Sequence, residues 1–129
     1  MNREILFRGK RVDNGKWVYG FYFRIWNRTY ILWGTTNGTP NMYEVYPETV
    51  GQDTGLLDKN GTKIFEGDRV KLDLNNEGYK NSVVVYRDDY MQFMFDHPKE
   101  VYTMTEYHLK PKDLEVIGNI HDKEVANND

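Results

Sequence analysis

Three histidines, His97, His108 and His121, are the side chains of this chain best suited to bind a metal ion or to carry protons. They are separated by eleven and thirteen residues, a spacing that matches neither His-x-x-x-His nor Glu-x-x-His. His97 and His108 flank a predicted pair of strands and could meet across a sheet, but no partner motif accompanies them. The chain has no cysteine, which removes thiolate ligands and disulfides. We therefore predict no metal site and no cofactor.

Acid–base and nucleophilic chemistry find little support in the remaining polar residues. Glu66 and Asp68 are two apart and would share one face of an extended segment, so a small carboxylate-based enzyme is one hypothesis. The simpler interpretation is a polar turn that leads into a strand. Ser82 is the single serine, and no Gly-x-Ser-x-Gly elbow surrounds it. No Gly-rich phosphate loop precedes a helix. We predict no catalytic residue.

The segment Asp58-Lys59-Asn60-Gly61 resembles the start of a calcium loop, but it fails the pattern. An EF-hand loop needs glycine at its sixth position and glutamate at its twelfth. Counted from Asp58, these positions are Lys63 and Arg69. Asn60-Gly61 instead supplies the positive backbone dihedral of a tight turn. We predict a turn here and no bound cation.

Basic and aromatic residues alternate in the N-terminal third, which is the region with the clearest functional character. Residues 1–33 contain seven Lys/Arg and two Asp/Glu, a net charge of +5, together with all three tryptophans. Such a sheet could bind single-stranded nucleic acid by stacking and charge. It could equally have one core face and one basic face whose long side chains reach solvent. The candidate binding surface comprises Arg8, Arg11, Arg24, Trp26, Arg28 and Tyr30.

The parity of one predicted strand bears on which side of this sheet is buried. Trp17, Tyr19, Phe21 and Phe23 alternate along it and would share one face. We expect that face to form the core of the sheet, because large aromatic side chains are normally covered.

The overall charge opposes a nucleic-acid binder, although its distribution is uneven. The chain has 129 residues and a net charge of −3. Residues 1–64 carry +3 and residues 65–129 carry −6. Such polarity can steer a partner or drive head-to-tail self-association. No apolar run is long enough for a signal peptide or a membrane span, so we expect a soluble, cytoplasmic protein with no membrane partner.

Strand patterns account for most of the chain, and helical patterns are nearly absent. Turn signals such as Asn37-Gly38 and Asn60-Gly61 separate short apolar runs. Val70, Leu72 and Leu74 alternate with polar residues, as in a half-buried strand. The best helical candidate is a single turn at residues 111–114. The predicted strands are residues 5–10, 17–25, 28–33, 69–74, 82–87, 92–95, 101–105 and 115–120, with 17–33 forming a hairpin.

These elements predict one domain over residues 1–122, followed by a frayed tail over 123–129. Within it we distinguish an aromatic, basic β-meander at residues 1–46 from a glycine-rich connector and barrel strands at residues 47–122. Both parts are small for independent stability, so we expect them to share one core. Glycines recur every four to six residues in the connector, which would be ordered only if Val50, Leu56, Ile64 and Phe65 were buried.

A distinctive string lies in the middle of the chain, where residues 47–70 read Pro-Glu-Thr-Val-Gly-Gln-Asp-Thr-Gly-Leu-Leu-Asp-Lys-Asn-Gly-Thr-Lys-Ile-Phe-Glu-Gly-Asp-Arg-Val. This string resembles the YopX protein family of bacterial phages and prophages. Residues 5–10 and 17–20 are similar to the family's opening, and residues 116–121 to its close. One departure is Asp53, where the family usually has an aromatic residue.

The resemblance implies a mainly β fold related to small SH3-like barrels, with an additional N-terminal hairpin or meander and at most one short helical turn. It implies a phage or prophage origin and no established activity. We expect a non-enzymatic accessory protein in a bacterial cell that binds a protein partner or itself. Nucleic-acid binding through the N-terminal sheet and a small carboxylate enzyme are the alternatives.

Overall fold

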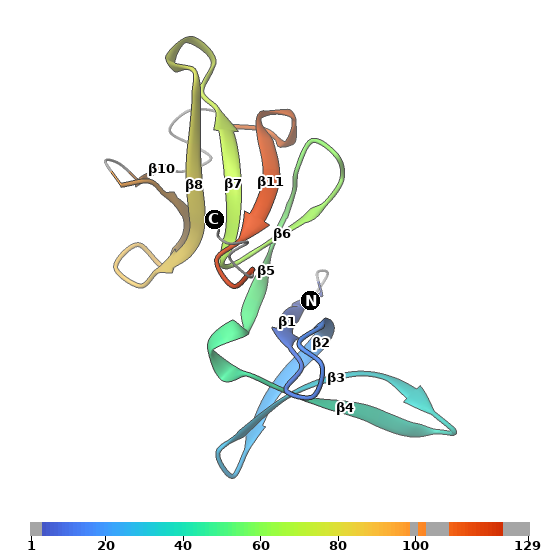
Figure 1. Cartoon of the computed structure of the whole chain (residues 1–129). Helices are drawn as coiled ribbons and strands as arrows, with labels where there is room; N and C mark the ends of the chain where they lie inside the picture. Colours follow the sequence, from blue (N-terminus) through green and yellow to red (C-terminus); the bar gives the residue numbers. More distant parts are fainter. Residues whose placement is uncertain (1–3, 99–100, 103–108, 123–129) are drawn as a thin grey trace. The chain divides into compact units, whose positions relative to one another are not determined.

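The computed structural model of the chain describes residues 4–98, 101–102 and 109–122. It divides into two compact units, Met1–Asp53 and Thr54–Asp129. The regular structure is mainly β and forms two antiparallel sheets (Figure 1). Tight turns and three single turns of 3₁₀ helix connect the strands. Within the described residues, no helix has the length and apolar character to cross a membrane.

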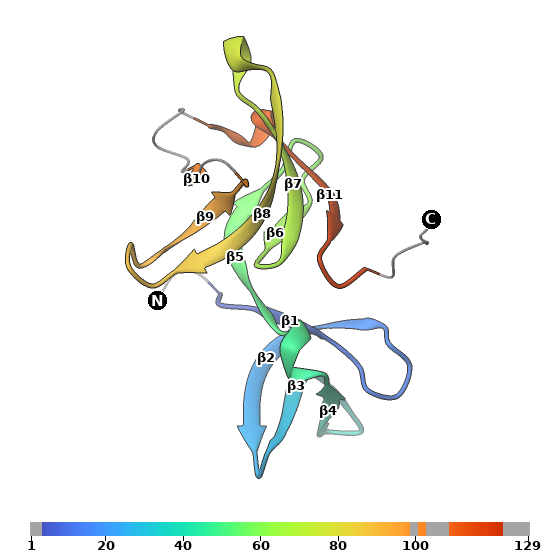
Figure 2. The same cartoon turned by 60° about the vertical axis from the view of Figure 1, so that its left-hand side comes forward.

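The first unit is an antiparallel meander, as the sequence predicts. The strand β2 (Trp17–Ile25) pairs with β3 (Arg28–Thr36) across a two-residue turn. On either side lie β1 (Phe7–Lys10) and β4 (Thr39–Val45), and a 3₁₀ turn at Pro47–Thr49 leads to β5 (Gly51–Leu57). The hairpin of β2 and β3 is prominent in Figure 2.

Residues paired across antiparallel strands share a face, so the register divides this meander into two faces. One face, which we call the inner face, holds the buried Thr29, Ile31 and Val45. The opposite face, which we call the outer face, carries most of the aromatic side chains. Its apolar members are Trp17, Tyr19, Phe21, Phe23, Ile25, Tyr30, Leu32 and Met42.

Glycine lets the inner face close around Val45. A Cβ atom on Gly9 would lie 2.9 Å from Cγ2 of Val45, so any side chain there would have to displace it. Two backbone hydrogen bonds hold the end of β4 beside β1: Tyr46 N–H donates to the Lys10 carbonyl and Val12 N–H to the Glu44 carbonyl. The small core of this unit therefore depends on a close backbone approach.

The second unit is built on a five-stranded sheet in the order β10-β9-β8-β7-β11 (Figure 1). The strands are β7 (Asp68–Asp73), β8 (Tyr79–Arg87), β9 (Gln92–Asp96), β10 (Val101–Tyr102) and β11 (Leu114–Asn119). The short β6 (Lys63–Phe65) hydrogen-bonds to β5, and 3₁₀ turns lie at Asn75–Glu77 and Pro111–Asp113. The buried core cluster contains Ile64, Val70, Leu72, Leu74, Val84, Phe95, Tyr102, Leu109 and Leu114.

Most of the predicted strands are confirmed, and the alternating Val70, Leu72 and Leu74 are all buried. The helical turn is confirmed as the 3₁₀ turn at Pro111–Asp113. The expectation of at most one such turn is wrong, because 3₁₀ turns also lie at Pro47–Thr49 and Asn75–Glu77. In the connector, Ile64 and Phe65 are buried as expected, whereas Val50 and Leu56 are only half-buried. Residues 103–105 of one predicted strand and the tail 123–129 lie outside the described residues.

Three strands have no counterpart in the sequence prediction. The strand β4 contains Pro40 and Asn41, which disfavour strand interiors, and β5 and β6 lie in the connector that the sequence assigns to turns. Long-range pairing overrides these local signals. The subdomain division predicted after residue 46 falls seven residues before the boundary between the compact units at Asp53; whether the two units act as one domain stays a prediction.

The expected SH3-like barrel is not confirmed. Within the described ranges, the five-stranded sheet ends at β10 and β11, and neither is hydrogen-bonded to the other. The connector strands do not close it, because β5 and β6 pair in the other sheet. The observed architecture is two antiparallel sheets.

Candidate functional site

Histidine and carboxylate side chains are the groups from which a metal centre could be built. Across residues 4–98, 101–102 and 109–122, no group of three or more His, Cys, Asp or Glu side chains is arranged to hold a metal ion. The His97 ring packs against Tyr102 with 6.2 Å between centroids, and the His121 backbone N–H donates to Asn119 Oδ1. His108 lies outside the described residues.

Asp68 is buried and engaged by the fold. Its Oδ2 accepts a hydrogen bond from Phe65 N–H at 2.8 Å, and its Oδ1 accepts one from Asn119 Nδ2 at 3.2 Å. The Ser82 hydroxyl is buried as well and donates to the Val70 carbonyl at 2.8 Å. These bonds satisfy the polar groups inside the unit, and they join β7 to the end of β11 and to β8.

Asp58 forms the predicted turn and also connects distant parts of the second unit. Its Oδ1 accepts hydrogen bonds from Asn60 N–H and Thr62 N–H, and its Oδ2 accepts one from Val116 N–H, all at 2.9 Å. Burial raises the pKa of this carboxyl, but the backbone hydrogen bonds outweigh burial and hold the pKa below its ordinary value. The carboxylate therefore holds the turn against β11, and its acceptor sites are filled by protein donors.

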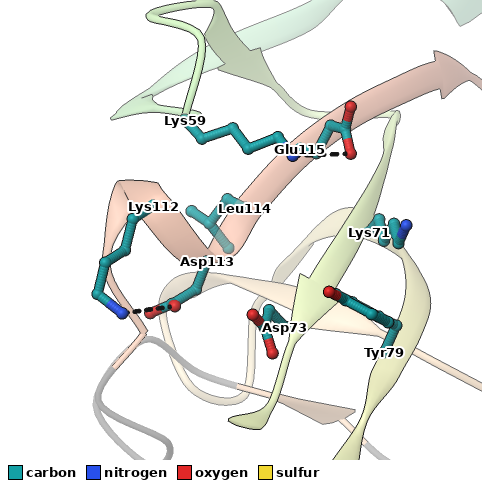
Figure 3. Close-up of a pocket in the computed structure, with 8 residues that line it drawn as sticks. All are labelled: Lys59, Lys71, Asp73, Tyr79, Lys112, Asp113, Leu114 and Glu115. Carbon is teal, nitrogen blue, oxygen red and sulfur yellow. Dashed lines mark hydrogen bonds and ion pairs between the residues drawn. The ribbon is translucent and has the colours of Figure 1, made fainter.

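A pocket of about 90 Å³ in the second unit gathers three lysines and three carboxylates (Figure 3). Lys59 pairs with Glu115 at 3.4 Å and Lys112 with Asp113 at 3.1 Å. A hydrogen bond from Lys110 N–H, together with Lys112, lowers the pKa of Asp113 despite burial. The ammonium of Lys71 lies 4.4 Å from the centre of the Tyr79 ring. The charges balance and the pocket is well below the ~300 Å³ of a typical ligand site.

The six residues of the predicted binding surface do not form one patch. Arg8 is buried, with its guanidinium carbon 4.4 Å from the centre of the Trp17 ring. Arg11 pairs with Asp13 through two hydrogen bonds of 2.9 and 2.6 Å. It also lines a hollow of about 240 Å³ beside β4.

The other four predicted residues belong to the β2–β3 hairpin. Arg24 lies on the inner side of β2, and Arg28 and Tyr30 lie on the outer face. Trp26 is in the turn between them and is 89% exposed. Of the six predicted residues, Arg24, Trp26 and Arg28 therefore lie together at the end of the hairpin.

The strongest candidate site is the outer face of the first unit. Four of its apolar side chains, Tyr19, Phe21, Ile25 and Met42, are between 44% and 55% exposed. Rings on this face contact one another and a neighbour: Phe23 stacks on Tyr30 with 5.2 Å between centroids, and the Phe21 ring lies 5.8 Å from that of Trp33. The face is thus a largely apolar surface.

The expectation that Trp17, Tyr19, Phe21 and Phe23 face the core of the sheet is wrong. Tyr19 and Phe21 are exposed, and the other two are half-buried. The buried Thr29, Ile31 and Val45 belong to the opposite face, where Gly9 leaves room for Val45 and Gly20 for the Leu32 carbonyl. Arg8 is also buried, but it pairs with Tyr19 and shares the outer face. The signal available in the sequence was the parity of these glycines, because a glycine in a strand often marks a close approach.

Comparisons with known proteins agree with this description. A family model described as YopX protein matches residues 6–124. The chain is also similar to the crystal structure of protein EF1440 from Enterococcus faecalis, with a TM-score of 0.53 and 21% identity, over 92% of this chain and 94% of that one. No curated protein matches the chain. The structural likeness concerns the fold alone.

Proposed function

Because the chain belongs to the YopX protein family, we propose that it is a phage- or prophage-derived accessory protein that acts in a bacterial cytoplasm by binding and not by catalysis. In this proposal the outer face of the first unit binds a protein partner. The observation that carries the proposal is the row of half-exposed aromatic and aliphatic side chains on that face.

The size of the exposed patch supports a protein interface. At roughly 100 Å² for each of its four most exposed side chains, the patch presents about 400 Å² of mostly apolar surface, a size at which the largest patch of a monomer is often functional. A standard interface buries about 800 Å² on each partner, which this patch and its rim would supply. Aromatic residues and methionine are enriched at such interfaces, where they bury large areas with few rotatable bonds.

The charges of the outer face favour protein over nucleic acid. Nη1 of Arg28 lies 3.7 Å from Oε1 of Glu44, and this carboxylate offsets the charge of the guanidinium. Arg8 and Lys10 are drawn against the Trp17 ring, at 4.4 and 5.2 Å from its centre. A single-stranded nucleic acid needs a continuous positive groove beside its stacking platforms. An apolar face whose few cations pair with Glu44 or lie against the Trp17 ring instead suits a protein surface.

A binding experiment with matched variants tests the proposal. The variant Phe21→Thr/Met42→Thr removes apolar area from the centre of the outer face while it keeps residues that suit strands. Ile117→Thr changes an exposed apolar residue of the second unit and serves as the control. The wild-type chain is immobilised, and proteins captured from nuclease-treated bacterial lysate are purified and titrated against all three forms. We expect at least tenfold weaker binding for the double variant and unchanged binding for the control.

Equal binding by the double variant, or no protein captured by the wild type, would contradict the proposal. Circular dichroism and thermal unfolding of each variant separate lost binding from lost folding.

A second candidate function is binding of single-stranded nucleic acid at the end of the β2–β3 hairpin. Trp26 is exposed there between Arg24 and Arg28, and an indole ring flanked by cations can stack on a base. Fluorescence anisotropy with single-stranded DNA and RNA would then show affinity that falls as salt rises and that Trp26→Ser abolishes. Absence of binding at low salt with protein near millimolar concentration would reject this candidate.

A further inference from the structure

Two hairpin turns place a large apolar residue in the left-handed backbone region, one in each unit. Trp26, in the turn between β2 and β3, has φ of 47°, and Met91, in the turn between β8 and β9, has φ of 55°. Residues with bulky side chains avoid this region, where the conformation costs about 1–2 kcal/mol. Both positions are therefore strained by the residue that occupies them.

Packing inside the fold does not explain the two residues. Trp26 is 89% exposed and Met91 is 79% exposed, the highest values among the exposed large hydrophobic side chains. The β3–β4 turn instead has residue types that adopt the left-handed region easily. Its two left-handed positions are Asn37 and Gly38, with φ of 52° and 81°. Strain together with exposure at two such positions indicates that these side chains are kept for contacts outside their own unit.

The charges around the two turns have opposite sign. Trp26 lies between Arg24 and Arg28, which are exposed and lie on opposite faces of the hairpin. Nη1 of Arg28 is 3.7 Å from Oε1 of Glu44, so the basic turn together with Glu44 keeps a net charge of +1. Asp88 and Asp89 precede Met91, and both are exposed as well. Arg87 bonds Asp89 through two hydrogen bonds of 3.1 and 2.9 Å, so the turn keeps a net charge of −1.

The units as a whole repeat this polarity. Residues 1–53 contain seven Lys/Arg and five Asp/Glu, a net of +2. Residues 54–129 contain ten Lys/Arg and fifteen Asp/Glu, a net of −5. Each copy of the chain therefore carries both a basic and an acidic partner surface.

We propose that copies of this chain associate head to tail, with the turn at residues 24–28 of one copy docking on the turn at residues 87–92 of another. The Trp26 ring contacts the Met91 thioether, a favourable sulfur–aromatic pair. Arg24 and Arg28 face the carboxylates of Asp88 and Asp89, where charge-assisted hydrogen bonds fix the orientation. The contact is heterologous, so it closes into a ring or extends into a chain.

This contact goes beyond the proposed function, because it uses the ends of two hairpins and not the outer face. The choice of a second copy follows from the matched pair of turns. Each copy of the chain supplies both a basic turn with an exposed indole ring and an acidic turn with an exposed thioether. Two copies therefore supply both sides of the contact.

Charge reversal tests the pairing. The variant Arg24→Glu/Arg28→Glu has two acidic turns, and Asp88→Arg/Asp89→Arg has two basic turns. We expect the wild type to gain mass with concentration in light scattering at low salt, and each variant to need at least tenfold higher concentration. An equimolar mixture of the two variants should associate again, because every turn then meets its opposite.

Several outcomes would overturn the proposal. A wild type that stays monomeric at several hundred micromolar, variants that associate like the wild type, or a mixture of folded variants that does not associate would each do so. Association of the wild type that is independent of concentration would place the contact within one chain and also overturn it.

Two further variants keep the outcome distinct from that of the proposed function. Phe21→Thr/Met42→Thr, which alters the outer face, should self-associate like the wild type even when it no longer binds a partner. Met91→Gly should weaken self-association at least tenfold and leave thermal stability equal or higher, because glycine relieves the left-handed strain. A Met91→Gly protein that associates normally would remove Met91 from the contact.

Discussion

The two units of this protein use their aromatic and aliphatic residues in opposite ways. The second unit buries nine of them in one cluster, and the buried Asp58 and Asp68 bind backbone groups around it. The first unit keeps only a small buried set on its inner face and presents a row of rings on its outer face. Stability is therefore concentrated in one unit and exposed binding surface in the other, a division that substitutions can test.

The largest effect is expected from a cavity in the core of the second unit. Leu72 is fully buried between β8 and β11, so Leu72→Ala removes apolar contacts on all sides. We expect the free energy of unfolding, measured in urea, to fall by about 3 kcal/mol. A loss below ~1 kcal/mol would show that the cluster is loosely packed.

The next effect concerns the carboxylate that joins the connector to β11. Asp58→Ala leaves the N–H groups of Asn60, Thr62 and Val116 without their acceptor. We expect the free energy of unfolding to fall by about 2 kcal/mol, because three partly buried hydrogen bonds to one carboxylate are lost together. Glu77→Ala, a change at an exposed carboxylate, is the control and should shift it by less than ~0.5 kcal/mol. Similar losses in both variants would contradict the role of Asp58.

Acid should remove the stabilisation that the Asp58 carboxylate provides. The pKa values of Asp58 and Asp113 in the folded protein are below their ordinary values, so folding favours their ionised forms. Their contribution to stability is complete above the unfolded-state pKa of about 3.9 and is lost as the pH falls through the lower folded-state values. Urea unfolding of the wild type and Asp58→Asn from pH 7 to pH 2.5 should show their difference shrinking in acid. A difference that grows in acid would contradict the sign.

A smaller effect is expected in the core of the first unit. Gly9→Ala places a Cβ atom 2.9 Å from Val45, and the strand has to shift. We expect a loss of about 1.5 kcal/mol in thermal or urea unfolding, typical of overpacking. Gly38→Ala, in an open turn, tests left-handed strain alone. If adding Val45→Ala to Gly9→Ala restores the free energy of unfolding that Gly9→Ala loses, the effect lies at this contact.

The smallest effect on stability, paired with a large effect on binding, is expected at the outer face. Phe21→Thr removes an exposed ring that contacts Trp33. We expect the free energy of unfolding to change by less than ~1 kcal/mol, since exposed positions contribute little. Partner binding measured by the same titration should weaken severalfold. A large loss of stability would mean that the outer face is part of a core.

The local sequence by itself determined most strands and turns of this protein. Alternation in Val70, Leu72 and Leu74 placed a half-buried strand, and Asn37-Gly38 and Asn60-Gly61 placed turns, because both signals depend on neighbouring residues alone. The central string of residues 47–70 also indicated the family. The turn at Asp58 followed from its own four residues, although the bond from Asp58 to Val116, 58 positions away, did not.

Only the tertiary structure decided which side of the first sheet is buried. The aromatic parity of β2 suggested the wrong face, because burial depends on what distant segments bring against a strand. Here the end of β4 lies against Gly9 on the inner face, and the rings of the outer face stay partly exposed. The strands β4 and β5 also form through distant segments. Hydrogen bonds from β3 hold β4 and hydrogen bonds from β1 hold β5, although the residues of both segments favour turns. Local propensity fixed the elements, and long-range pairing fixed their faces.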